Sequence, residues 1–398
     1  MGPFPRTLSV LVADHPPKRT DFAPHPDPLP LLPLLRAQHN RPSTAAPQRS
    51  AQPRAQRGPL PAVDWRRVRI LYVAMAHDYG NPERGPSFEE TNFRSALDGM
   101  GHDLVPFDFM ERAKAVGKPA MRKELIATAA EVKPDAAFFC LFTDELDTAT
   151  IEAIDAPTVN WFADDHWRFD SYTRHMAPAF DLAVTTDAAS LPKYEAAGIR
   201  NVLLSQWACN RYAYGRTGDG IEHDVTFVGQ PHGNREEIIG RITAAGHDVA
   251  CWGFGWPAGK LDHEGMVRVF STSRVNLNLS NSSTPPNTLR VRVGRWLGRG
   301  PKGPQPPQIK GRNFEVPGCG GFLLTESVPH LGEYFELGKE VAVYDGPDDL
   351  VEQVGYWLEH DDERAAVADA GYRRVMAEHT YDHRFETIFR ALGLGGGS

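Results

Sequence analysis

Short apolar runs alternate with amphipathic segments along the chain from residue 68 onwards. Runs at 68–75, 102–109, 134–142, 157–163, 181–186 and 201–206 are rich in Val, Ile, Leu and Phe and predict buried strands. Segments at 87–101, 120–133, 147–154 and 189–198 lie between these runs and predict helices. Ser87 and Glu90 have the spacing of a capping box at the start of the first helix. This alternation predicts a parallel sheet covered by helices on both faces.

The same pattern restarts near residue 223. Residues 223–256 predict a strand, a glycine-containing loop, a helix and a second strand. A helix at 263–273, strands at 275–280 and 322–325, a helix at 330–338 and a strand at 340–345 follow. Three helices, at 348–360, 362–379 and 381–393, end the pattern. The predicted fold class is therefore α/β, with two Rossmann-like, doubly wound parallel-sheet domains that face a cleft.

These patterns divide the chain into three parts. Residues 1–63 hold 14 of the 33 prolines and have no helical or strand period, which predicts a disordered Pro/Arg-rich tail. Residues 64–210 are expected to form the first domain and residues 211–392 the second. Within the second, residues 284–311 form a Gly/Pro/Arg-rich loop that could fold over a ligand or remain a surface loop.

Charge is distributed unevenly between the tail and the rest of the chain. The net charge is −8, but residues 1–63 hold 8 Lys or Arg against 3 Asp or Glu. The tail is thus compatible with peripheral contact with a membrane surface or an acidic partner. The remainder is acidic and lacks the basic face that nucleic-acid binding needs, so an anionic ligand must be met by a few local cations.

Composition is typical of a globular protein: 41% of the residues are hydrophobic and 24% are charged. No apolar run is long enough to span a bilayer, and the first residues lack the pattern of a secretory signal. The four cysteines are far apart and show no metal-binding spacing. A cytoplasmic location is therefore expected, without disulfides or a zinc site.

Four stretches of the second half resemble the CgeB-like glycosyltransferases, a family with the two-domain GT-B architecture. They are VTFVGQPHGNRE from residue 225, CWGFGW from residue 251, KGRNFEVPGCGGFLLTE from residue 310, and the segment from Tyr344 to Arg384. In the first half, NWFADDHWRFD and the segment from residue 185 to 208 resemble this family more weakly. Residues 1–63 share nothing with it. The resemblance implies transfer of a sugar from a nucleotide-diphosphate sugar, which is a co-substrate, with no further cofactor.

The resemblance also assigns a role to Glu315. Related GT-B enzymes carry two glutamates separated by seven residues, and the second accepts hydrogen bonds from the ribose hydroxyls. Glu315 stands four residues before Cys319, where that second glutamate is expected, whereas Pro307 occupies the position of the first. A carboxylate can accept both hydroxyls of a diol. The alternative is an ordinary acid in the first turn of a helix, where acids are favoured.

Cations and glycines near Glu315 fit the rest of a nucleotide diphosphate. A diphosphate is bound by backbone N–H groups at a helix start and by fixed cations. Gly229 and Arg235 lie at the start of a predicted helix, and Lys310 and Arg312 precede Glu315, while Gly320 and Gly321 form a corner before a strand. The alternatives are an ordinary strand–helix turn with Arg235 in solvent, and a solvated basic loop. Trp256 is expected to form a wall for the base or to be buried at a strand end.

The acceptor side is expected in the first domain, where Asp164, Asp165 and His166 follow the strand at 157–163. Deprotonation of an attacking hydroxyl needs a carboxylate or imidazole within hydrogen-bond reach. Adjacent strand residues point in opposite directions, so only one of the two aspartates should reach the hydroxyl. Asp165 is preferred, together with His166, and His77 and Asp144 are rivals. The aspartate pair resembles the metal motif of other glycosyltransferases, but that motif belongs to a different fold, so no metal is predicted.

The resulting hypothesis is a metal-independent glycosyltransferase of the hexosyltransferase type that acts on a hydroxyl acceptor. Two alternatives remain at this stage. One is a non-catalytic sugar- or nucleotide-binding protein in surface or envelope assembly, which the missing first glutamate favours. The other is a nucleotide-sugar epimerase, which shares the two-domain architecture.

Overall fold

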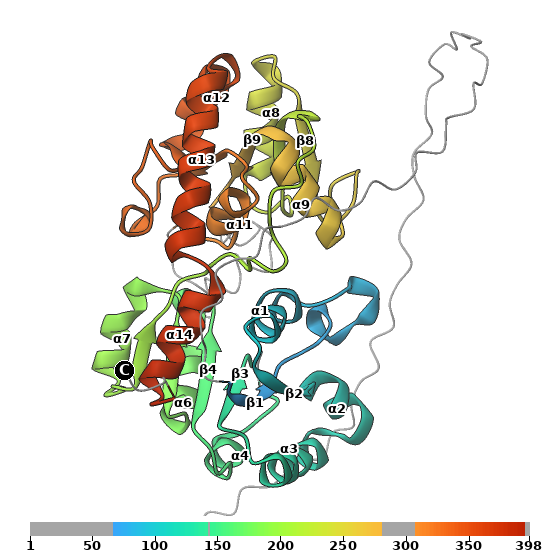
Figure 1. The fold of residues 1–398 in the computed structure, drawn as a ribbon, viewed down its shortest axis with the longest axis vertical. Helices are drawn as coiled ribbons and strands as arrows, with labels where there is room; N and C mark the ends of the chain where they lie inside the picture. Colours follow the sequence, from blue (N-terminus) through green and yellow to red (C-terminus); the bar gives the residue numbers. More distant parts are fainter. Residues whose placement is uncertain (1–66, 142–143, 281–306, 395–398) are drawn as a thin grey trace, which may run out of the picture. The chain divides into compact units, whose positions relative to one another are not determined.

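The structure is a computed structural model that describes residues 67–141, 144–280 and 307–394. Residues 1–63 and most of the loop at 284–311 lie outside the described residues. The described chain contains two parallel sheets, which are drawn with their helices in Figure 1. Both sheets alternate with helices along the chain, so the predicted α/β class is confirmed.

The first sheet has the strand order β2-β1-β3-β4-β5-β6, and every pair in it is parallel. Its strands are β1 (Arg69–Val73), β2 (Asp103–Phe107), β3 (Ala136–Phe139), β4 (Thr158–Phe162), β5 (Leu182–Thr185) and β6 (Val202–Leu204). The chain connects them through α1 (Ser95–Gly99), α2 (Phe109–Val116), α3 (Lys118–Val132), α4 (Thr148–Glu152), α5 (Asp165–Arg168), α6 (Arg174–Met176) and α7 (Leu191–Ala196). The central strands β3, β4 and β5 are buried along their whole length, as expected of a parallel sheet.

Both faces of the first sheet are covered. On one face, Leu71 and Phe139 pack with Phe109 of α2 and Leu125 of α3. On the other face, strand residues such as Ile70 and Phe138 pack with α1 and with α14 (Tyr381–Ala391). Helix α14 supplies four buried side chains to this core, namely Tyr381, Phe385, Ile388 and Phe389. The end of the chain therefore completes the hydrophobic core of the first sheet.

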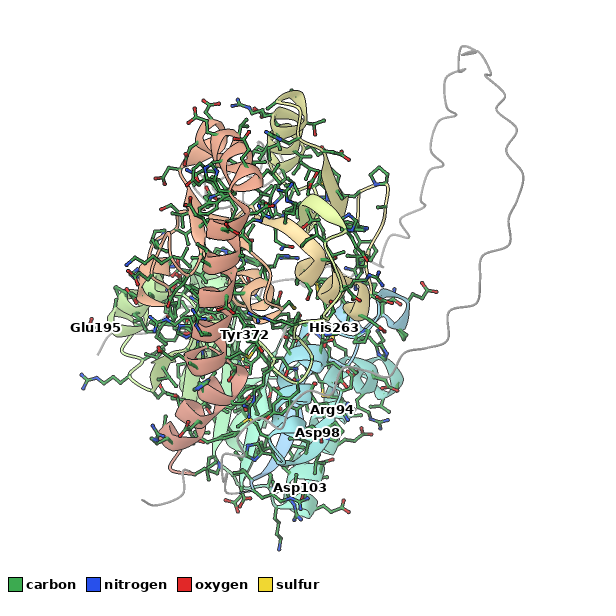
Figure 2. The ribbon with its side chains drawn as sticks, turned by 45° about the horizontal axis from the view of Figure 1, so that its top comes forward. Arg94, Asp98, Asp103, Glu195, His263 and Tyr372 are labelled. Atoms are coloured by element: carbon green, nitrogen blue, oxygen red, sulfur yellow. The ribbon has the colours of Figure 1, made fainter. Side chains whose placement is uncertain are left out.

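The second sheet has the order β11-β10-β9-β7-β8, and it too is parallel. Its strands are β7 (His223–Val228), β8 (Val249–Trp252), β9 (Ser273–Asn278), β10 (Leu323–Glu326) and β11 (Ala342–Tyr344). Helices α8 (Arg235–Ala244) and α12 (Gly346–Glu359) cover one face, and α9 (His263–Thr272), α11 (Arg312–Gly318) and α13 (Asp361–Glu378) pack with the other core. Two side chains of this lobe, Tyr372 and His263, hold the segment between the sheets, and Figure 2 labels both. The Arg216 guanidinium lies over the Tyr372 ring at 4.0 Å, and His263 Nε2 donates to the Ala213 carbonyl at 3.1 Å.

One predicted helix, at 330–338, does not form. The structure has a single 3-10 turn there, Leu331–Glu333, between His330 and Gly338, which both have positive φ. Leu337 instead forms an isolated bridge with Val341, and the Glu340 carboxylate accepts from the Glu336 amide. The helical spacing of the apolar residues is real, but left-handed residues at both ends limit the segment to one turn.

Two buried histidines, His102 and His379, are expected to make the unfolding free energy depend on pH. Burial lowers the pKa of both His102 and His379 to about 4, and for His379 the nearby Arg384 cation adds to the effect. The unfolded chain takes up protons below about pH 6.5, whereas the folded protein does not until about pH 4, so acidification in that window favours unfolding. We expect each histidine to remove about 2 kcal/mol of unfolding free energy between about pH 7 and pH 5.

Urea unfolding at several pH values measures this loss. His102→Gln keeps an acceptor for the Val68 amide and should remove the contribution of one histidine, about 2 kcal/mol, from the loss between about pH 7 and pH 5. The exposed His232 offers the matched control, since His232→Gln should leave the pH dependence unchanged. Equal slopes for His102→Gln and wild type would contradict the prediction.

Candidate functional site

The carboxyl edge of the second sheet carries a buried arginine. Arg235 begins α8, and its guanidinium donates from Nη1 to the Gln230 carbonyl at 2.8 Å and from Nη2 to the Leu279 carbonyl at 2.6 Å. It also lies over the Phe227 ring at 5.2 Å. The side chain thus ties the loop after β7 to the end of β9 and does not point into solvent.

Two more cations, Lys310 and Arg312, belong to the same cluster: Arg312 acts on the pKa of Arg235, and both arginines act on the pKa of Lys310. Burial lowers the pKa of Arg235 to about 10, and the charge of Arg312 adds to this. Burial also lowers the pKa of Lys310; the Asp164 carboxylate opposes that shift, and Arg235 and Arg312 reinforce it. Within the described part of the chain, none of the three cations has a salt bridge, and Arg312 Nε is buried without a hydrogen-bond partner. Clustered cations of this kind favour an anion.

Glu315 lies in the first turn of α11 with its carboxylate buried. Burial raises its pKa, while Arg312 and a hydrogen bond from Tyr214 act in the opposite direction. The carboxylate folds back towards the start of the helix and lies close to Gly311: a Cβ atom added to Gly311 would be only 2.9 Å from Glu315 Oε1. Glu315 and Arg312 are therefore neighbours at the start of α11, and neither is turned out to solvent.

A buried amide network, which sequence analysis missed, holds this end of α11 in place. Asn313 Oδ1 accepts from the Lys310 amide at 2.8 Å, and Asn313 Nδ2 donates to Thr325 Oγ1 at 3.1 Å. Asn278, at the end of β9, donates to both Asn313 Oδ1 and Thr325 Oγ1. The network connects the start of α11, and the Lys310 amide just before it, to β9 and β10. Its sequence signal is weak, since single Asn and Thr residues are also common in turns, where their side chains bond to the backbone.

The three glycines proposed as ligand contacts have packing roles in the structure. The Gly229 carbonyl accepts from Trp256 Nε1 at 2.7 Å, and a Cβ there would lie 2.8 Å from the Phe227 ring. Gly320 has a φ of +73°, which favours glycine at the end of α11. A Cβ on Gly321 would collide with the Phe270 carbonyl. Trp256 is half-buried, and its indole N–H is used to fix the loop.

Helix α11 also makes a close contact that can be tested. A Cβ on Gly318 would collide with the Cys209 sulfur, so we expect Gly318→Ala to lower the unfolding free energy by about 2 kcal/mol. Gly240→Ala is the matched control, because no atom lies within 4 Å of its added Cβ. That change should stabilise α8 by about 0.5–1 kcal/mol. Chemical denaturation measures both, and Cys209→Ala should restore part of the loss; a stable Gly318→Ala protein would contradict the packing of α11.

In the first lobe, Asp165 is buried and both of its carboxylate oxygens are hydrogen-bonded within the protein. Its carboxylate is fully buried: Oδ1 accepts from Thr173 Oγ1 at 2.6 Å and Oδ2 from Tyr194 OH at 2.7 Å. Burial raises its pKa despite these hydrogen bonds. In this conformation Asp165 connects α5 to the segments around it and cannot reach an acceptor hydroxyl. Strand alternation does not set the directions of Asp164 and Asp165, because β4 ends at Phe162 and a helix begins at Asp165.

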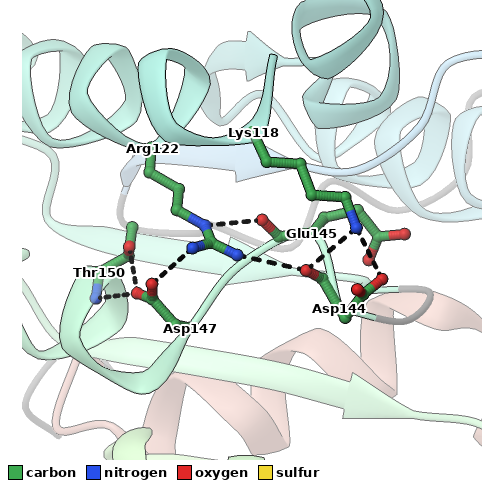
Figure 3. A network of polar contacts seen from close by, with 6 residues as sticks. All are labelled: Lys118, Arg122, Asp144, Glu145, Asp147 and Thr150. Atoms are coloured by element: carbon green, nitrogen blue, oxygen red, sulfur yellow. Dashed lines mark hydrogen bonds and ion pairs between the residues drawn. The ribbon is translucent and has the colours of Figure 1, made fainter. Parts of the chain in front are cut away.

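His166 is half-buried, and burial lowers its pKa to about 4, with Asp164 opposing the shift and Lys310 adding to it. The imidazole is therefore neutral at neutral pH but only weakly basic. The rivals lie elsewhere. His77 forms an isolated bridge with Pro86. The Asp144 side chain is 85% exposed and is paired with Lys118, in a network that also holds Arg122 (Figure 3).

A pocket opens at the carboxyl edge of the first sheet, beside Asp164. Its polar lining includes Glu89, Asp164 and Arg168, and its apolar lining includes Phe88, Trp161 and Trp207, among others. Burial raises the pKa of Glu89, although hydrogen bonds from Ser87 and from its own amide act in the opposite direction. Sequence analysis missed Glu89, since an acid beside a predicted capping box looks like part of the cap. Ser87 does accept from the Glu90 amide at 3.0 Å, as the capping-box spacing predicted.

Two π-helical turns flank this pocket. One spans Glu90–Arg94 and follows Glu89 directly, and the other spans Phe169–Thr173 and follows Arg168. In the first turn, Glu90 pairs with Arg94, which Figure 2 labels. π-helical turns are rare in proteins, and many of those that do occur lie at functional sites. Among the described residues, no group of three or more His, Cys, Asp or Glu side chains could hold a metal ion, and no helix is long and apolar enough to cross a bilayer.

Known structures match this arrangement across most of the chain. A sucrose-phosphate synthase from Thermosynechococcus elongatus has a TM-score of 0.53 at 10% identity, and a glycosyltransferase from Rickettsia africae has 0.53 at 8%. The Anabaena protein HepE, in complex with UDP and glucose, has a TM-score of 0.53 at 12% identity. Each match covers 82% of this chain and 99% of the other. The chain has the GT-B fold.

A protein-family model also matches part of the chain, mainly in the second lobe. Residues 235–390 match the family described as glycosyl transferase-like. The matched region begins at Arg235 and includes Lys310, Arg312 and Glu315, which the structure brings together. None of the curated proteins compared with the chain matches its sequence. The expectation of a glycosyltransferase-like GT-B fold is therefore supported, and the CgeB-like assignment stays a prediction.

Proposed function

We propose that this protein is a glycosyltransferase that moves a sugar from a nucleoside-diphosphate sugar to a hydroxyl acceptor. The observation that carries the proposal is the group of three cations at the start of α8 and α11. Lys310 and Arg312 have no carboxylate ion pair within the described residues, and Arg312 lies beside the buried Glu315. A diphosphate would neutralise the cations, and Glu315 would accept the ribose hydroxyls.

The donor assignment is also supported by the relatives. HepE is described in complexes with UDP and glucose and with UDP-glucose. By analogy, we propose that the donor of this protein is a uridine-diphosphate hexose. In this proposal, Lys310 and Arg312 offset the charge of the departing diphosphate, so the reaction does not depend on a metal. A CgeB-like family membership agrees with the motif around Glu315.

The acceptor hydroxyl is assigned to the pocket in the first lobe. Glu89 and Asp164 line it, whereas Asp165 does not. We assign Glu89 as the general base that accepts the proton of the attacking hydroxyl. Burial raises the pKa of Glu89, and a base is most effective when its pKa lies near the working pH. We further propose that residues 64–210 together with α14 form the acceptor lobe. Residues 211–380 then form the donor lobe.

A screen of nucleotide sugars tests the function. The protein should be stabilised by one donor, and a ligand held at about 100 times its dissociation constant adds about 2.7 kcal/mol of unfolding free energy. Incubation with that donor should then release the nucleoside diphosphate and free sugar. Isomerised donor would instead establish an epimerase, and binding without turnover would establish a binding protein, which Pro307 at the position of the first glutamate favours. Either result would overturn the transferase.

A further inference from the structure

The pocket of the first lobe contains two buried hydrogen-bonding groups that have no partner within the described residues. They are Trp161 Nε1 and Tyr172 OH. The Trp161 side chain is only 3% exposed. A buried polar atom without a hydrogen bond costs free energy, so native proteins usually satisfy such groups or use them for a ligand. Both residues line the same pocket, next to Glu89 and Asp164.

The walls of the pocket are aromatic and held in place by one another. The Trp161 ring lies 4.9 Å from Phe93 and 6.1 Å from Trp207, and Trp207 lies 5.1 Å from Phe88 in an edge-on arrangement. Tyr172 packs on Phe162 at 6.2 Å, and Arg168 lies over the Tyr172 ring at 4.5 Å. Rigid aromatic faces of this kind pack well against the C–H face of a saturated ring.

The polar groups then restrict what that ring can carry. An indole N–H needs an acceptor, carboxylates need donors, and a tyrosine hydroxyl can be either. A hydroxyl group meets all three needs, because it donates and accepts. A purely apolar ring would leave both unpartnered groups unsatisfied. A phosphorylated ring would meet two carboxyl groups, Glu89 and Asp164, against a single cation, Arg168.

From this arrangement, we infer that the pocket binds a neutral, hydroxyl-rich ring of the acceptor, such as a saccharide, and that Trp161 and Tyr172 select it by hydrogen bonds. That this ring belongs to the acceptor rests on the proposed function. The preference of the pocket for such a ring can be measured without turnover. Trp161 and Trp207 lie in its walls, so binding should change the tryptophan fluorescence of the protein.

The test is a fluorescence titration of the full chain, saturated with UDP, against methyl glycosides of glucose, galactose, mannose and N-acetylglucosamine. Cyclohexylmethanol and glucose 6-phosphate serve as apolar and anionic comparators. We expect saturable binding of at least one methyl glycoside and weaker binding of both comparators. Tyr172→Phe, which removes only the hydroxyl, should weaken that binding about five- to tenfold. Tyr356→Phe, at an exposed position on α12, should not change it.

Trp161→Phe provides a second variant that removes the other group, read by calorimetry because it also removes a fluorophore. The inference is overturned if no methyl glycoside binds, if a comparator binds more tightly, or if both variants bind the glycoside as wild type does. Failure of the proposed function looks different. In that case no nucleotide sugar stabilises the protein, whatever the pocket binds. Stabilisation by a nucleotide sugar without any glycoside binding would sink the pocket assignment alone.

Discussion

Glu89→Gln is expected to lower kcat for sugar transfer about 10²–10⁴-fold, the range by which a positioned proton acceptor usually speeds a reaction. The amide keeps the size and the hydrogen-bonding shape of the side chain but cannot take a proton. Donor affinity should be unchanged, since Glu89 lies in the first lobe and the cations lie in the second. Initial-rate kinetics with varied donor and acceptor separate these two effects.

The neighbouring residue provides the control for this variant. Glu90 lies in the π-helical turn and pairs with Arg94, so Glu90→Gln should change kcat little. The pH dependence gives a second check. Because burial raises the pKa of Glu89, the rate of wild type should fall with acidification at a higher pH than an ordinary glutamate would give. A Glu89→Gln enzyme with wild-type kcat would remove Glu89 from the reaction.

Lys310→Met is expected to weaken UDP binding about ten- to hundredfold and, at the same time, to stabilise the unliganded protein. A charge-assisted contact contributes about 1.5–3 kcal/mol to binding. In the unliganded protein the cation is disfavoured, because burial, Arg235 and Arg312 all lower its pKa. Its positive charge therefore costs folding free energy at neutral pH, and the neutral methionine avoids that cost. We expect the melting temperature to rise by a few degrees.

Calorimetric titration with UDP and a thermal melt without it measure the two effects. Lys339 is exposed on the second lobe and pairs with Glu336, so Lys339→Met is the matched control and should leave UDP affinity unchanged. A Lys310→Met protein that binds UDP as wild type does would show that Lys310 is not a phosphate ligand. A lowered melting temperature would show that Lys310 stabilises the unliganded fold.

The architecture could be predicted from sequence because strand and helix periodicity are local properties. Buried runs such as Ala136–Phe139 identify a parallel sheet wherever the chain goes next. The packing of α14 could not be predicted in the same way. Its apolar face is visible in the sequence, but the partner of that face is the first sheet, which is distant in the chain. Periodicity shows that a face is buried and does not show against which sheet.

The site was predicted unevenly for a related reason. The sequence indicated Arg235, Lys310, Arg312 and Glu315, and the structure places them together, although their binding roles stay predictions. The acceptor residues depended on side-chain direction after β4, where the chain leaves the strand two residues before Asp165. Glu89 and Tyr172 depend on two π-helical turns, and such turns have no simple sequence period.

The central claim is that the second lobe binds the diphosphate of a nucleotide sugar through its clustered cations. Calorimetric comparison of UDP, GDP, ADP and dTDP with their monophosphates, in wild type and in Arg312→Met, tests it most directly. One diphosphate should bind wild type at least about tenfold more tightly than its monophosphate, and most of that difference should vanish in Arg312→Met. Equal affinity for diphosphate and monophosphate in wild type, or a difference that survives in the variant, would contradict the account.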